Sequence, residues 1–140
     1  MSKNWRAVLV VLALIFGWHI GAQEPAVKPR PQTFSLDCPG GDCPLLKGTP
    51  QTTGMRAGSV RLKPAERVGW HSTGQNEEVL TILRGSGVVN IEGQPEMALR
   101  SNMLAYIPPR TRHNVTNTGI DVLEYVWVVA PLKDASEPGR

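Results

Sequence analysis

The chain has few of the features that mark nucleic-acid-binding or helical proteins. Its 15 Lys and Arg residues face 12 Asp and Glu residues, without a basic run or an interleaving of basic and aromatic residues, which argues against a nucleic-acid partner. No apolar stripe with helical spacing occurs after the first two dozen residues. Gly (14) and Pro (12) are frequent instead, which fits short strands joined by turns. With 140 residues and no internal repeat, the chain predicts one domain.

Long apolar runs are also missing, apart from one near the N-terminus. Lys3 and Arg6 precede a run over residues 7–18, and small residues follow up to Ala22. This order predicts a signal peptide over residues 1–23. An uncleaved N-terminal membrane anchor is the alternative, because residues 20–22 would extend the run toward a full span. Both interpretations place the domain outside the cytoplasm, in the periplasm or secreted, and limit membrane contact to this segment.

Cysteine is scarce, with only Cys38 and Cys43 in the sequence. They flank four residues that favour a turn, so in an oxidising compartment we expect a small disulfide loop. A redox pair or half of a metal site are the alternatives. The four intervening residues are not the usual two of a redox motif, and no second Cys or His pair lies nearby. Residues 24–50 are expected to form a Pro-rich linker and an irregular segment containing this loop.

Residues 51–132 predict an all-β domain, followed by a tail over 133–140. Turn signals recur about every 8–12 residues, as in a sandwich or barrel. In the longest strand, Leu123, Tyr125, Trp127 and Val129 share one face, because side chains alternate along a strand. The expected strands cover residues 55–63, 67–71, 78–83, 87–91, 96–99, 103–107, 113–117 and 122–130.

Only two histidines, His71 and His113, follow the N-terminal segment. His71 ends a predicted strand, Glu78 begins the next one, and His113 begins a strand after a proline-stiffened turn. If these three strand faces line one interior, two imidazoles and one carboxylate converge there. Such a set suits a divalent ion of Fe, Mn, Ni, Zn or Cu with coordination positions left open. Packed, purely structural histidines are the alternative.

Two stretches resemble the paired motifs of the cupin superfamily. Residues 69–85 carry His71, then Glu78, then six residues before Gly85; residues 102–117 carry Pro108, His113 and Asn117 at the spacings of the second motif. The resemblance covers roughly residues 55–132. It implies a double-stranded β-helix, or jelly-roll, barrel after the N-terminal segment and linker, with His71, Glu78 and His113 as metal ligands.

The sequence departs from these motifs at three positions. Thr73 stands where a second histidine is expected. Because a hydroxyl is a poor ligand for such ions, the ligand set is reduced to three, and Thr73 would instead orient a bound water or substrate. Loss of metal binding is the alternative. Asn102 and Arg110 replace glycines, and Asn tolerates left-handed backbone geometry.

Other polar and aromatic residues have interpretations of their own. Glu77 should point away from the face of Glu78, although a one-residue slip in register would exchange the two. Arg110 and Arg112 are either solvated loop charges or a bidentate grip on a carboxylate or phosphate of a ligand. The remaining large aromatics are expected in the core or at an interface: Trp70, Tyr106, Tyr125 and Trp127.

These features leave three function classes open. A metalloenzyme would oxidise, isomerise or cleave a small organic molecule by metal-assisted chemistry, with a dioxygenase-like oxidoreductase among the options. A non-catalytic module would bind or sense a small, possibly anionic ligand. A structural homodimer would pair through the apolar strand near residues 122–130.

Overall fold

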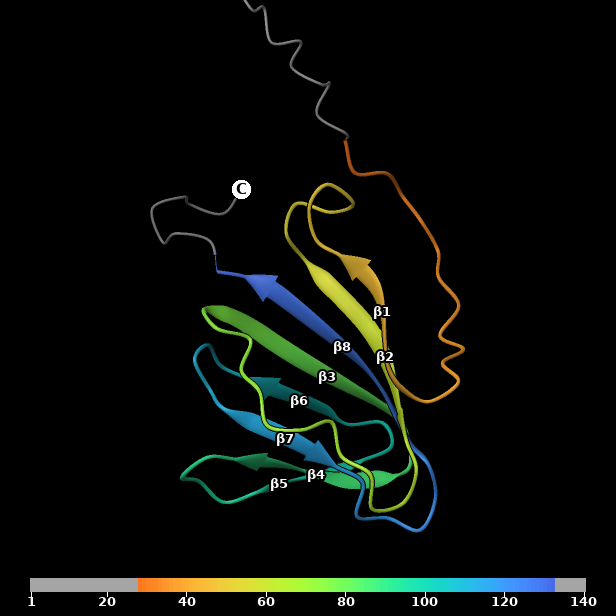
Figure 1. Ribbon diagram of the computed structural model, residues 1–140, viewed down its shortest axis with the longest axis vertical. Coiled ribbons are helices and arrows are strands. Elements are labelled where there is room, and N and C mark those ends of the chain that lie inside the picture. Colours follow the sequence, from red (N-terminus) through yellow and green to blue (C-terminus); the bar gives the residue numbers. More distant parts are fainter. Residues whose placement is uncertain (1–27, 133–140) are drawn as a thin grey trace, which may run out of the picture.

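The computed structural model describes residues 28–132, which form two antiparallel sheets that face each other (Figure 1). One sheet has five strands in the order β1-β2-β8-β3-β6, and the other has three in the order β5-β4-β7. The expected all-β jelly roll is confirmed, since no helix occurs within residues 28–132. The strands are β1 (Gly41–Lys47), β2 (Arg56–Leu62), β3 (Asn76–Arg84), β4 (Ser86–Ile91), β5 (Met97–Arg100), β6 (Leu104–Ile107), β7 (His113–Thr116) and β8 (Leu123–Pro131).

The hydrophobic core lies between the two sheets. Alternate residues of β8 face inward as the sequence predicts, with Leu123, Tyr125 and Val129 all at most 4% exposed. Burial of these side chains supplies the main driving force that holds the two sheets together. The core consists of Val60, Leu62, Leu80, Ile82, Val89, Leu99, Ile107, Val115, Leu123 and Tyr125.

Strand register brings distant residues into common rows on the inner face of the larger sheet. Arg56 of β2 is opposite Val129 of β8, which is opposite Glu78 of β3. In the next row, Trp127 of β8 has Gly58 as its β2 partner. Directly opposed residues on antiparallel strands point to the same face, so each row forms a continuous strip of side chains.

The structure corrects two expectations about regular structure. The segment over residues 34–50, expected to be irregular, contains β1, which pairs with β2 at the edge of the sheet. Its register shifts between Pro44 and Leu46, and an edge strand tolerates proline because one side of the strand has no partner. The strand expected over 67–71 is reduced to isolated bridges at Arg67 and His71, where Gly69 with φ of 107° bends the chain.

The predicted disulfide is present between Cys38 and Cys43. The segment that precedes β1 is tied to the sheet by two contacts with β2. Ser59 donates to the carbonyl oxygen of Leu36 over 3.2 Å, and Arg61 donates to that of Cys38 over 3.4 Å. The disulfide loop therefore belongs to the folded domain.

The predicted signal peptide, the first residues of the linker and the tail over 133–140 lie outside the described residues. Among residues 28–132, none belongs to a helix long and apolar enough to cross a membrane.

Candidate metal centre

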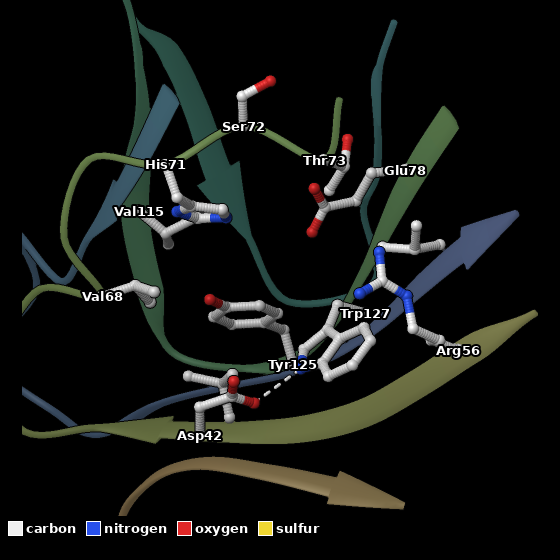
Figure 2. A pocket seen from close by; sticks show the side chains of 12 residues that line it. Asp42, Arg56, Val68, His71, Ser72, Thr73, Glu78, Val115, Tyr125 and Trp127 are labelled. Carbon is white, nitrogen blue, oxygen red and sulfur yellow. Dashed lines mark hydrogen bonds between the residues drawn. The ribbon is translucent and has the colours of Figure 1, made fainter. Parts of the chain in front are cut away.

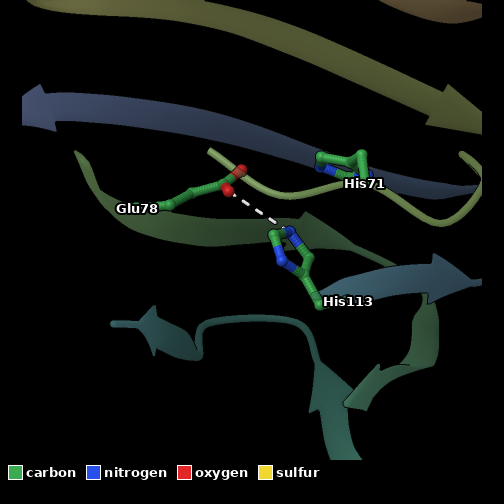
Figure 3. A group of neighbouring side chains, drawn as sticks. All are labelled: His71, Glu78 and His113. Atoms are coloured by element: carbon green, nitrogen blue, oxygen red, sulfur yellow. Dashed lines mark ion pairs between the residues drawn. The ribbon is translucent and has the colours of Figure 1, made fainter. Parts of the chain in front are cut away.

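Three elements bring His71, Glu78 and His113 together. His71 and His113 are cross-strand neighbours that exchange both backbone hydrogen bonds at 2.9 Å, so their imidazoles lie on the same face with ring centres 4.3 Å apart. Glu78 extends from β3 toward them (Figure 3). The available ligand atoms of the three side chains all lie within 4.8 Å of one another.

Two of the three residues are buried, and one side-chain atom of each lacks a hydrogen bond. His113 is 0% exposed and Glu78 is 5% exposed. Nε2 of His113 lies 3.2 Å from Oε2 of Glu78, yet neither atom makes a hydrogen bond within the described residues. Buried polar atoms nearly always have partners, and leaving one without a partner costs about 1–3 kcal/mol. Two such atoms facing each other can be satisfied by a proton shared between them or by a metal ion that binds both.

Backbone carbonyls orient both imidazoles. Nδ1 of His71 lies 2.9 Å from the carbonyl oxygen of Gly69, and Nδ1 of His113 lies 3.1 Å from that of Thr111. Because a carbonyl oxygen only accepts, in the neutral form of each ring Nδ1 carries the proton and Nε2 keeps its lone pair. A carbonyl bound to the far nitrogen is the usual support of a metal-binding histidine.

The charge state of His113 depends on opposing effects. Burial lowers its pKa, but the Glu78 carboxylate and the Thr111 carbonyl more than offset burial, so the pKa of His113 is raised above its usual value. A neighbouring carboxylate favours the cationic ring, and a metal ion beside Glu78 would take the place of that proton. Two neutral imidazole nitrogens and one carboxylate fit a divalent transition metal with open coordination positions.

A cavity of about 180 Å³ opens beside this group (Figure 2). Its lining includes His71, Glu78 and Thr73, which the sequence indicates. It also includes four residues that sequence reasoning did not assign to a site: Asp42 of β1, Arg56 of β2, and Tyr125 and Trp127 of β8. Alternation along β8 correctly places Tyr125 and Trp127 on the inner face, but no sequence signal brings Asp42 or Arg56 to them.

Trp127 forms one wall of the cavity and depends on a glycine. A Cβ on Gly58 would lie 2.6 Å from the Trp127 ring and 2.7 Å from the carbonyl oxygen of Cys43, so only glycine leaves room for the indole. The ring nitrogen of Trp127 donates to Oδ1 of Asp42 over 2.7 Å. The disulfide loop, through Asp42, thus fixes the position of the wall.

Tyr125 supplies a neutral hydroxyl to the cavity. Burial, reinforced by the carboxylates of Glu78 and Asp42, raises the pKa of Tyr125. The phenol therefore stays protonated at neutral pH and can donate a hydrogen bond to a ligand.

The other predicted polar residues lie in different settings. The hydroxyl of Thr73 donates to the carbonyl oxygen of Asn76 over 3.1 Å. Arg110 donates to the Gln75 side chain. Arg112 pairs with Glu92 at 2.7 Å and lies over the ring of Trp70; neither arginine lines the cavity.

The structure confirms the predictions for Glu77 and Asn102 and shows the contacts of Asn117. Glu77 points away from Glu78 and accepts a hydrogen bond from the hydroxyl of Tyr106. Asn117 donates to the backbone carbonyls of Leu62 and Asp121. Asn102 adopts a left-handed conformation, with φ of 65°.

Arg110 also adopts a left-handed conformation, with φ of 60°. Its backbone N–H donates to the carbonyl oxygen of Gly74. The loop that positions His113 therefore follows the backbone path that a glycine would favour. Arginine adopts this left-handed conformation only with strain.

Comparisons with known proteins agree with this fold. The family model described as a cupin domain matches residues 58–129, about half of the chain. The polyketide synthase CurC of Streptomyces cyaneus is 31% identical over 96 residues, which cover 66% of this chain and 61% of that protein. Protein SchB of Streptomyces halstedii is 30% identical over 104 residues, which cover 72% of this chain and 74% of that protein.

A solved structure extends the likeness to the fold. An uncharacterised conserved protein with a double-stranded β-helix domain from Klebsiella pneumoniae superimposes with a TM-score of 0.61. The superposition covers 73% of this chain and 91% of the other, at 20% sequence identity. At that identity the likeness concerns the fold alone.

Proposed function

Because this chain belongs to the cupin family, we propose that it binds a divalent metal ion through His71, Glu78 and His113 and acts there on a small organic molecule. The observation that carries the proposal is the pair of buried atoms without hydrogen bonds, Nε2 of His113 and Oε2 of Glu78, with His71 alongside. When bound, the metal would supply Lewis-acid or redox chemistry at its open positions.

The residues of the chain have defined parts in this proposal. The carbonyls of Gly69 and Thr111 hold the two imidazoles with Nε2 available. Tyr125 donates a hydrogen bond to a ligand oxygen, and Trp127 excludes water from one side of the cavity. The name of one relative, a polyketide synthase, supports a small organic substrate, with oxidation, isomerisation and lyase chemistry as the reaction types.

Binding without turnover is the second candidate function. Apart from the three proposed ligands, the described residues that line the cavity include one carboxylate, that of Asp42, and no imidazole. Asp42 already accepts a hydrogen bond from Trp127, and Glu77 points outward. The cavity thus offers few groups for proton transfer, which favours a binding or sensing module. Substrate turnover by metal-loaded protein would decide between the two functions.

Metal content measured by plasma mass spectrometry tests the proposal. The full chain, purified without a histidine tag and loaded anaerobically with Fe(II), Mn(II), Ni(II) or Zn(II), is expected to hold about one ion per chain. Glu78→Gln and His113→Ala should lose the ion, whereas Glu77→Gln should retain it. Wild-type protein that stays metal-free after loading would refute the proposal.

We also propose that the domain works in an oxidising compartment, in the periplasm or secreted. The Cys38–Cys43 disulfide supports this location, because such bridges persist outside the reducing cytoplasm. Fractionation of the expressing cells, followed by thiol labelling of each fraction, tests it. Recovery of reduced protein in the cytoplasm alone would contradict the proposal.

A further inference from the structure

The cavity extends from the candidate metal centre to an arginine on the same face of the sheet. Arg56, Val129 and Glu78 occupy one cross-strand row. Neighbouring strands are about 4.8 Å apart, so the backbones of Arg56 and Glu78 are roughly 10 Å apart. Figure 2 shows the Arg56 side chain reaching up beside Trp127 on the side of Glu78.

The Arg56 side chain has no ion-pair or hydrogen-bond partner among the described residues. Arg61 and Arg84 pair with Glu124, and Arg112 pairs with Glu92. Arg56, by contrast, makes no ion pair or side-chain hydrogen bond with any residue in 28–132, although it lines the cavity. Its five N–H donors are therefore available to a ligand.

Apolar side chains make up much of the remaining lining of the cavity, and its other carboxylate, that of Asp42, accepts a hydrogen bond from Trp127. Val60, Val68, Val115 and Val129 contribute aliphatic surface, and Trp127 contributes its ring. The volume of about 180 Å³ is below the range of roughly 300–1,000 Å³ that holds drug-sized ligands. The space therefore fits a compact molecule with an apolar body.

The geometry points to a small organic acid as the ligand, with its carboxylate bound by the Arg56 guanidinium and its other oxygen donors directed to the metal centre. This inference rests on the proposed metal site. An arginine matches a carboxylate with two parallel N–H···O bonds. The Tyr125 hydroxyl, which stays protonated, adds a donor to the same molecule. A phosphate is less well suited, because it carries more negative charge than a carboxylate and a single exposed arginine would have to balance most of that charge.

Calorimetric titration at low ionic strength tests the inference. The metal-loaded full chain is titrated with malonate, succinate and glutarate, whose different lengths span the distance between the metal centre and Arg56. Succinamide, a neutral relative of succinate, and inorganic phosphate serve as comparison probes. Arg56→Gln is expected to weaken binding of the best dicarboxylate about tenfold, the lower end for a charged hydrogen bond, because Arg56 is exposed and partly screened.

Two variants control for nonspecific effects of charge. Arg100→Gln removes one positive charge from β5, outside the cavity, and should leave the affinity unchanged. Arg56→Lys keeps the charge without the planar fork and should restore only part of the affinity. Metal content is measured on every sample.

The outcomes separate the two proposals. Wild-type protein without metal would overturn the proposed function. Metal retained in Arg56→Gln together with an unchanged dicarboxylate affinity would overturn only the assignment of Arg56. Three other results with metal-loaded wild type would overturn the organic-acid assignment. Succinamide would bind as tightly as succinate, or phosphate would bind more tightly than any dicarboxylate. The third such result is that no dicarboxylate binds.

Discussion

Replacing Glu78 with glutamine separates the effect of the buried carboxylate on folding from its effect on metal binding. Glutamine has nearly the same shape, but its amide group can donate a hydrogen bond. In the neutral His113 ring, Nδ1 carries the proton, so Nε2, 3.2 Å from Oε2 of Glu78, has a lone pair available. Glu78→Gln would therefore pair two atoms that lack hydrogen bonds in the wild type.

The expected gain follows from the cost of leaving such atoms without partners. A buried polar group without a hydrogen bond costs about 1–3 kcal/mol. We therefore expect Glu78→Gln to raise the free energy of unfolding of the metal-free protein by about 1–3 kcal/mol at pH 8. For a domain of about 100 residues, each kcal/mol raises Tm by about 4 °C or more.

Metal should make the wild type more stable to unfolding than Glu78→Gln, the reverse of the order expected without metal. At a free metal concentration of a thousand times Kd, the wild type gains about 4.1 kcal/mol, which exceeds the expected gain of the variant. The neutral amide of the variant is a weaker ligand for these ions, so the variant should gain little. Thermal and urea unfolding, each with chelator and with excess Zn(II) or Mn(II), measure both effects, and Glu77→Gln is the matched control because its side chain faces outward.

The gain in the metal-free protein should also depend on pH. Because the pKa of His113 is raised in the folded state, the wild type gains stability from the protonated ring beside Glu78. That contribution is fully present below the unfolded pKa of about 6.5 and is lost as pH rises through the folded pKa. The advantage of Glu78→Gln should therefore be larger at pH 8 than at pH 6. A variant that is less stable than the wild type in chelator at pH 8 would refute this reasoning.

Three other variants test the surroundings of the candidate metal centre. Gly58→Ala should lower the free energy of unfolding by about 1–3 kcal/mol through overpacking and shift the Trp fluorescence. Gly40→Ala, with open space around its Cβ, is the control and should do neither. Equal effects of the two variants would contradict the close contact of Gly58 with Trp127. Replacing Cys38 and Cys43 together with serine should cost about 2 kcal/mol of stability, the chain entropy of so short a loop; urea unfolding identical to that of the wild type would show that the bridge does not stabilise the fold. Arg110→Gly should stabilise by about 0.5–1 kcal/mol, because relief of the left-handed conformation exceeds the added entropy of the unfolded chain; a lower Tm would mean that the bond to Gln75 outweighs the strain.

Local patterns account for the parts of the fold that the sequence predicts. Alternation identifies the inner face of β8, and turn signals locate most of the strands. The segment that forms β1 escapes detection because Gly41, Pro44 and Gly48 are typical of turns. Pairing with β2 overrides these local preferences, as tertiary context often does for strands.

The candidate metal centre is the part of the site that the sequence describes best. His71 and Glu78 are close in the chain and flank one loop, so their spacing carries information about their relative position. His113 follows a stiffened turn, and the resemblance to the second cupin motif adds it to the pair. What the residues could not indicate by themselves is that Nε2 of His113 and Oε2 of Glu78 are buried without other partners, because burial depends on the packing of both sheets.

The sequence by itself determined the strand faces, the turns, the cysteine pair and the types of residue at the candidate metal centre, because these depend on neighbours within a few positions. Only the tertiary structure decided what surrounds the centre. Asp42 meets Trp127 across 85 positions of sequence, and Arg56 reaches the row of Glu78 through β8. Such contacts depend on the register between strands far apart in the chain, and no local pattern specifies that register.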